Sequence, residues 1–123
     1  MLIDFTNKTI IVTGGTSGIG KEIAIKFAEL GGNLIITGTS SSKPKDIPIS
    51  ISYYQLDLLD DSSLDNFIEQ LGHLPQIDIL INNAGINVIN ELDMINVNDH
   101  DEVIKVNLNG PFIISKKLVN KMK

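Results

Sequence analysis

The segment from Gly14 to Gly20 has the glycine spacing of a phosphate-binding turn, with glycines at 14, 18 and 20. A β-branched run, residues 8–13, precedes the turn, and an apolar helical pattern follows it. Residues without a Cβ let the backbone turn sharply and let a pyrophosphate approach closely. The N–H groups that begin the following helix then face the anion. This pattern therefore predicts a site for nucleotide phosphates.

The same turn has a second interpretation, a tight strand-to-helix connection with no ligand. Its context favours phosphate binding, because such a motif requires a strand before it and a helix after it. Three side chains could add hydroxyl donors to the site: Thr13, Thr16 and Ser17.

Groups for acid–base or metal chemistry are scarce. Tyr53 and Tyr54 lie in a predicted strand, so we interpret them as sheet residues. His73 and His100 lie in separate segments of the sequence, so they do not suggest a metal pair or a catalytic triad. We expect both at the surface. The absence of cysteine excludes disulfides, thiolate metal sites and a cysteine nucleophile. No metal site is predicted.

Strands and helices alternate along the chain. Strand patterns cover residues 8–13, 33–38, 49–56 and 76–82, and helical patterns cover 20–30, 60–71 and the chain from 99 onward. Alternation of this kind implies right-handed crossovers and a parallel sheet. We predict one domain, residues 1–123, with an open α/β sheet of strand order 3-2-1-4 and helices on both faces. The connection 39–48 is serine-rich and holds two prolines, which argues against a full helix there.

The segment T-G-G-T-S-G-I-G, residues 13–20, resembles the cofactor signature of the short-chain dehydrogenase/reductase family. The segment N-N-A-G, residues 82–85, is similar to the family's second signature, and V-N-L-N-G-P-F, residues 106–112, is similar to its active-site asparagine segment. The resemblance covers nearly the whole chain. It implies a three-layer, Rossmann-like fold and hydride transfer between a nicotinamide dinucleotide and a carbonyl or alcohol.

The resemblance also implies a role for each matching residue. Asn107 would kink its helix and present a backbone carbonyl to a water of the proton relay, although its amide could instead bond within its own helix. Asp57 and Leu58 would frame the adenine. The amides of Asn82 and Asn83 could instead tie loop backbone groups, and for Asn82 this is at least as good an interpretation as ligand contact. The remaining cofactor positions are Gly14, Thr16, Ser17, Gly18, Ile19 and Gly20 at the pyrophosphate and its ribose, Thr39 after the second strand, and Asn83, Ala84 and Gly85 at the nicotinamide-side ribose.

The choice of cofactor depends on the end of the second strand. An acid about 20 residues beyond the glycine turn normally binds the ribose hydroxyls of NAD. Here residues 37–41 contain no acid, and the first one is Asp46. We therefore predict NADP(H) in preference to NAD(H), since a carboxylate would repel its 2′-phosphate. The chain has no arginine, and the nearby cations are Lys43 and Lys45, which could equally be solvated.

Family catalysis uses a tyrosine and a lysine four residues later on one helix. Tyr53 and Tyr54 are instead followed by Asp57 and Leu58, so the chain resembles the front half of a family enzyme. We expect dinucleotide binding without catalysis by this chain alone. Two alternatives remain open: a working reductase that needs the missing half from another chain, and a non-catalytic interaction or structural protein that reuses the fold.

Composition limits the partners. The net charge of −5 argues against a binder of nucleic acid or anionic membranes, because both need a basic face. The content of 42% hydrophobic residues is ordinary for a globular domain and argues against disorder. The N-terminus, residues 1–4, lacks the features of a signal peptide, and no apolar segment reaches the roughly 20 residues of a membrane span. We expect a cytoplasmic protein. The open sheet edge and two apolar stripes on the last helix predict a homo-oligomer.

Overall fold

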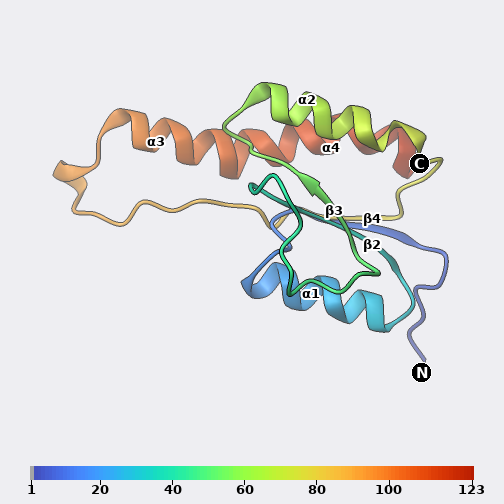
Figure 1. Cartoon of the computed structure of the whole chain (residues 1–123). Coiled ribbons are helices and arrows are strands. Elements are labelled where there is room, and N and C mark those ends of the chain that lie inside the picture. The colour runs from blue at the N-terminus through green and yellow to red at the C-terminus, as the bar shows by residue number, and fades with distance from the viewer. Residues whose placement is uncertain (1) are drawn as a thin grey trace.

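Four strands form one parallel sheet in the computed structural model, which describes residues 2–123 (Figure 1). Met1, part of the N-terminal segment considered above, lies outside the described residues. The order β3-β2-β1-β4 confirms the predicted 3-2-1-4 topology. The strands are β1 (Thr9–Val12), β2 (Asn33–Gly38), β3 (Ser52–Gln55) and β4 (Ile79–Ile81).

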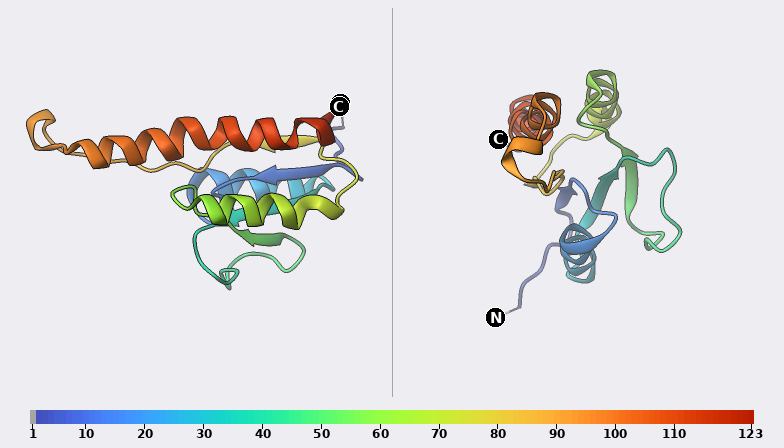
Figure 2. Two further views of the ribbon diagram at one scale, coloured as in Figure 1. Left: turned by 90° about the horizontal axis from the view of Figure 1, so that it is seen from above. Right: turned by 90° about the vertical axis from the view of Figure 1, so that its left-hand side faces the viewer.

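Helices cover both faces of the sheet, as predicted (Figure 2). Helix α1 (Gly18–Glu29) lies on one face, and α2 (Asp61–Gln70) and α4 (Gly110–Met122) lie side by side on the other. Short 3₁₀ turns, η1 (Leu71–His73) and η2 (Leu92–Met94), follow α2 and precede α3. Among residues 2–123, no helix has both the length and the apolar composition to cross a membrane.

The last three helical segments join into one rod: α3 (Val97–Ile104), the π-helical turn η3 (Lys105–Asn109) and α4. The rod begins at Val97, two residues before the predicted start, because the Asn96 side chain caps it by accepting a hydrogen bond from the Asp99 N–H at 2.7 Å. Its α3 end reaches beyond the edge of the sheet (Figure 1).

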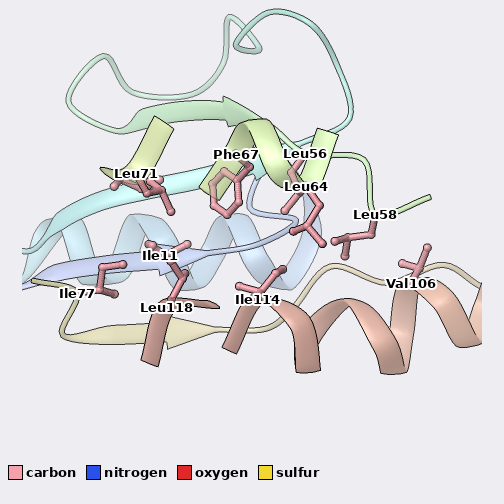
Figure 3. Close-up of a cluster of buried hydrophobic side chains, with 11 residues drawn as sticks. Ile11, Leu56, Leu58, Leu64, Phe67, Leu71, Ile77, Val106, Ile114 and Leu118 are labelled. Carbon is pink, nitrogen blue, oxygen red and sulfur yellow. The ribbon is translucent and has the colours of Figure 1, made fainter. Parts of the chain in front are cut away.

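Each face of the sheet has its own apolar core. On the α2/α4 face, Ile11 of β1 packs with Phe67 of α2 and with Ile114 and Leu118 of α4 (Figure 3). All four side chains are buried. On the α1 face, the alternate β1 residues Ile10 and Val12 join Ala24 and the alternate β2 residues Leu34 and Ile36. The central residues of β1 and β2 are therefore buried on both faces of the sheet, which explains why their apolar residues do not alternate with polar ones.

The connection between β2 and β3, residues 39–51, contains no helix, as predicted. Two buried side chains, Ile47 and Ile51, anchor it to the α1-face core. The Lys43 ammonium donates hydrogen bonds to the carbonyls of Pro48 and Ile51. The connection thus replaces a helix with two apolar anchors and an internal lysine bond.

Candidate functional site

The three glycines of the turn meet different steric demands. Gly14 and Gly18 have φ angles of +64° and +56°, which disfavour side chains. A Cβ at Gly18 would meet no atom within 4 Å, so this position opens onto solvent. A Cβ at Gly20 would overlap the Gly14 carbonyl oxygen and the Nδ2 atom of Asn83. Gly20 therefore allows the start of α1 to lie against the ends of β1 and β4.

The start of α1 presents several unused donors. Its first backbone bond runs from the Lys21 N–H to the Ser17 carbonyl, at 3.2 Å. Gly14 and its neighbour donate their N–H groups to Thr37, at 3.1 Å each. The N–H groups between these two sets, those of residues 16–20, have no hydrogen-bond partner within residues 2–123. They provide the donors that an anion needs at a helix N-terminus.

The Thr13 hydroxyl is already engaged, contrary to the expectation that it could donate to a ligand. The residue is 1% exposed, and its Oγ1 accepts hydrogen bonds from the N–H groups of Asn83 and Ala84, both at 3.0 Å. Its own proton is directed to the Ile81 carbonyl at 3.5 Å. Thr13 therefore holds the end of β4 against β1, and only Thr16 and Ser17 of the predicted hydroxyls line the cleft.

The two asparagines after β4 have separate partners. The Asn83 amide donates to the Gly14 carbonyl at 3.0 Å, which is the loop-tying role considered for both asparagines. Asn82 instead donates to the Ser115 hydroxyl on α4 at 3.3 Å. Both side chains thus fix the loop after β4 relative to its neighbours, and the backbone from Asn83 to Gly85 forms one wall of the site.

A cleft of about 300 Å³ opens where the carboxyl ends of β1, β2 and β4 meet. This is where ligands bind in open α/β sheets. Three residues that line the cleft were not predicted as site residues: Thr37, Gly38 and Leu56. Their positions at the carboxyl ends of the second and third strands could have indicated them. The cleft brings together seven of the predicted residues, Gly14, Thr16, Ser17, Thr39, Asn83, Ala84 and Gly85.

Two further predicted residues line an adjoining cleft. Gly18 and Ile19 lie beside a space of about 580 Å³ that shares Thr16 and Ser17 with the first cleft. Ile19 is 74% exposed beside this space. Gly20 lines neither space and is buried.

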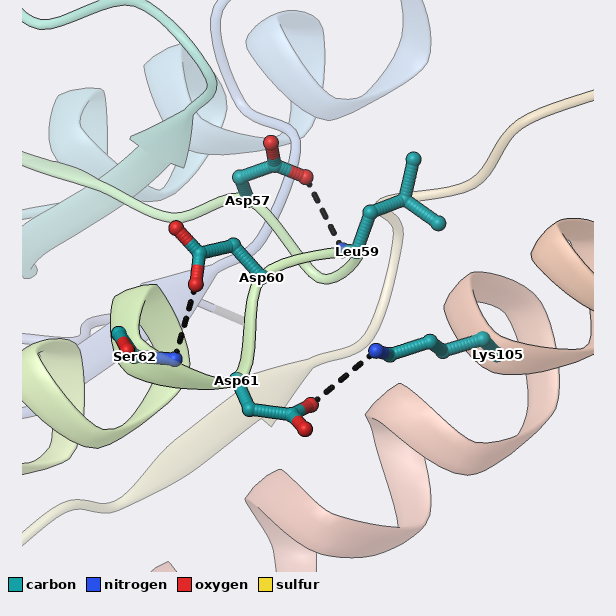
Figure 4. A network of polar contacts seen from close by, with 6 residues as sticks. All are labelled: Asp57, Leu59, Asp60, Asp61, Ser62 and Lys105. Atoms are coloured by element: carbon teal, nitrogen blue, oxygen red, sulfur yellow. Dashed lines mark hydrogen bonds and ion pairs between the residues drawn. The ribbon is translucent and has the colours of Figure 1, made fainter.

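Asp57 and Leu58, predicted to frame the adenine, lie outside the 300 Å³ cleft. An Asp57 carboxylate oxygen accepts the Leu59 N–H at 3.0 Å in the turn that leads into α2 (Figure 4). The Leu58 side chain is buried against Gly110, where a Cβ would lie 2.9 Å from it. In this arrangement both side chains serve the α2 turn and the core, so their adenine contact stays a prediction.

The same turn carries a charged contact to the long helical rod. Asp60 caps α2 by accepting the Ser62 N–H at 2.9 Å. Asp61 pairs with Lys105 of η3 at 3.2 Å (Figure 4). Because Lys105 begins the π-helical turn that holds Asn107, this ion pair connects the start of α2 with the part of the rod nearest the cleft.

Asn107 binds the loop after β4. Its Oδ1 accepts the Ile86 N–H and its Nδ2 donates to the Ile86 carbonyl, both at 2.8 Å. The alternative that the amide bonds within its own helix is therefore wrong. The residue lies at the centre of the π-helical turn, and the predicted kink stays a prediction. Its role in a proton relay stays a prediction.

Tyr53 has an environment unsuited to a general base. Its hydroxyl donates to the Ser40 carbonyl, and burial raises its pKa above the ordinary tyrosine value. A base that acts near neutral pH needs a lowered pKa. Both histidines are exposed, as predicted. Tyr53 therefore has a structural role, bracing β3 against the connection that follows β2.

Comparison with known proteins agrees with this geometry. A family model described as short chain dehydrogenase matches residues 8–123. A 3-oxoacyl-[acyl-carrier-protein] reductase FabG of Aquifex aeolicus is 37% identical over 131 residues, covering 99% of this chain and 53% of the relative. The chain thus spans about half the length of the curated relatives that it matches.

Solved structures share the fold. The Pseudomonas aeruginosa RhlG/NADP active-site complex superimposes with a TM-score of 0.88 at 24% identity, covering 98% of this chain and 50% of that one. A short chain dehydrogenase from Leptospira borgpetersenii with bound NAD+ gives 0.82 at 26% identity, covering 94% and 46%. The family match over nearly all of the sequence, on a sheet with this glycine turn, establishes that the chain belongs to the short-chain dehydrogenase family.

Proposed function

We propose that the chain, as one domain, is the dinucleotide-binding part of an oxidoreductase that transfers hydride between NADP(H) and a carbonyl or alcohol. The row of unpaired N–H groups at residues 16–20, beside the cleft, is the observation that carries this proposal. A pyrophosphate fits it chemically, because the donors converge at a helix N-terminus and Gly18 leaves open space before them. The cofactor would supply the hydride, and the chain's residues would hold and orient it.

The preference for NADP(H) rests on the end of β2. No carboxylate is among the residues that line the 300 Å³ cleft, and Thr39 stands where an acid would bind the ribose hydroxyls of NAD. Of the predicted cations, Lys43 is bonded to two carbonyls of its own loop. The relatives include one structure with NADP and one with NAD+, so the residues of this chain carry the argument.

We expect titration calorimetry to show binding of both dinucleotides, with NADPH the tighter. Mixing the chain with NADPH and a panel of carbonyl substrates is expected to give no oxidation above background, because Tyr53 and Tyr54 lie in β3 with no lysine one helical turn away. Tighter NADH binding would overturn the cofactor preference. Turnover above background would show that this chain holds an acid–base pair that we have not identified.

A second function, self-association or another protein contact, is favoured by one surface. Leu108 and Phe112 are 62% and 67% exposed, and they form an apolar face on the rod with Ile104 and Val119. The opposite stripe, Val106, Ile114 and Leu118, is buried on the sheet. One apolar stripe of the rod is thus uncovered within residues 2–123.

Sedimentation velocity at increasing protein concentration tests this surface. We expect a dimer or larger species, and we expect Leu108→Lys together with Phe112→Lys to return it to monomer because both positions are exposed. A single monomeric boundary at all concentrations would contradict self-association. Absence of dinucleotide binding, together with such assembly, would favour the non-catalytic alternative.

A further inference from the structure

An ion pair lies beside the glycine turn and was not expected from the sequence. The Lys21 ammonium, in the first turn of α1, bonds an Asp46 carboxylate oxygen at 2.7 Å. Lys21 is 27% exposed and Asp46 is 64% exposed. The hydrogen bond and the charge of Lys21 lower the pKa of Asp46, which favours its charged form. Asp46 belongs to the connection between β2 and β3.

This pair lies close to the end of β2. Lys21 follows Ser17 by four residues, so both lie on one face of the helix start. Lys21 and Asp46 line the 580 Å³ cleft, which shares Thr16 and Ser17 with the dinucleotide cleft. A Cβ on Gly38 would lie only 2.7 Å from Thr16, so β2 ends directly against the shared wall. An adenosine ribose held at the end of β2 would therefore be separated from Lys21 by the residues that both clefts share, Thr16 and Ser17.

Lys21 is the one cation among the residues that line the 580 Å³ cleft. Lys43, the closer cation in sequence to the end of β2, is bonded to loop carbonyls. Glu22 also lines the space, so with Asp46 its charged side chains sum to one negative charge. A phosphate entering it would meet repulsion from the acids unless Lys21 turned to it.

We propose that Lys21 is the specificity-determining residue that binds the 2′-phosphate of NADP(H), and that Asp46 is its competing partner in the free chain. This inference rests on the proposed function, because it needs a dinucleotide in the cleft. Phosphate binding exchanges one partner of the ammonium for another: the Lys21–Asp46 bond is given up, and a charge-assisted bond to phosphate forms. NAD(H) carries no group that makes this exchange, so it leaves the ion pair intact.

The experiment compares the dissociation constants of NADPH and NADH for the unmodified chain and four variants by titration calorimetry. We expect Lys21→Gln to weaken NADPH binding by roughly fivefold, as for a partly exposed charge contact, with NADH unchanged. We expect Asp46→Asn to strengthen NADPH binding by about twofold, because the competing carboxylate is gone. Lys26→Gln is the matched control, since Lys26 is an exposed lysine on the same helix and only contacts Glu29 at 3.8 Å. It should leave both constants unchanged.

Each outcome has a stated meaning. Rescue of NADPH binding by Lys21→Arg would support a charge contact to phosphate. Equal loss of both dinucleotides in Lys21→Gln, or an unchanged ratio of the two constants, would overturn the assignment while the proposed function stood. Weaker NADH binding in Asp46→Asn would also overturn it, because Asp46 would then bind the ribose hydroxyls. Failure of the unmodified chain to bind either dinucleotide would overturn the proposed function as well.

Discussion

Replacing Gly20 with alanine is expected to lower the free energy of unfolding by about 2–4 kcal/mol and to abolish dinucleotide binding. The new Cβ would overlap the Gly14 carbonyl oxygen and the Asn83 amide. Neither can move freely, because they are hydrogen-bonded to each other at 3.0 Å. Relief of the overlap must push α1 away from β4, and this breaks the tie between the two walls of the cleft.

Urea denaturation followed by circular dichroism measures the loss, and calorimetry with NADPH measures binding. Gly72→Ala is the matched control, because a Cβ there meets no atom within 4 Å. Its effect should stay within about 0.5 kcal/mol, the usual range for surface changes. Equal denaturation midpoints for Gly20→Ala and the unmodified chain would show that the start of α1 can shift without cost.

Replacing Thr13 with valine is expected to destabilise the chain by about 2–5 kcal/mol, although the two side chains have nearly the same shape. The change removes the hydroxyl that accepts from Asn83 and Ala84, at a position that is 1% exposed. Two part-buried N–H groups would then have no acceptor at that position, each at a cost of about 1–3 kcal/mol. The β4 wall of the cleft should loosen at the same time.

Thr13→Ser separates the hydroxyl from the methyl group. It keeps the acceptor and removes only a methyl, so we expect a loss of about 1 kcal/mol. The stabilities of both variants can be compared by urea denaturation. We expect dinucleotide binding to be kept by the Thr13→Ser variant and weakened in the Thr13→Val variant. If the valine variant proved as stable as the serine variant, the hydroxyl would not be what holds β4 at this end of the sheet.

Local patterns in the sequence were sufficient for the framework. The β-branched runs, the glycines and the spacing of apolar residues gave the strand order, the helices on both faces and the absence of a helix after β2. Seven of the cofactor positions came together at one cleft, because parallel strands bring their carboxyl ends to the same edge. These features depend on neighbours in sequence or on the general rules of α/β packing.

Side-chain partners were harder to predict. Thr13 was expected to face a ligand, yet its acceptors and donors lie about 70 residues away in sequence. The Lys21–Asp46 pair joins positions 25 apart through a connection of irregular shape. Asp57 follows a strand, as an adenine-binding acid would. Its carboxylate accepts a hydrogen bond from the Leu59 N–H in its own turn. The hydrogen-bond partner of each side chain depends on which donors and acceptors the fold brings near it, and the spacing of residues in the sequence does not specify this.

The long sequence separation of the bonds around Thr13 also constrains how the molecule acquires its site. Closing a loop of about 70 residues costs chain entropy before any contact offsets it, so β4 is expected to dock late in folding. A partly folded chain with only β1, α1 and β2 would have the glycine turn but no Asn83–Gly85 wall. During synthesis the cleft can therefore form only after residue 85 has left the ribosome. A ligand that binds only this finished edge draws the folding equilibrium toward the complete sheet.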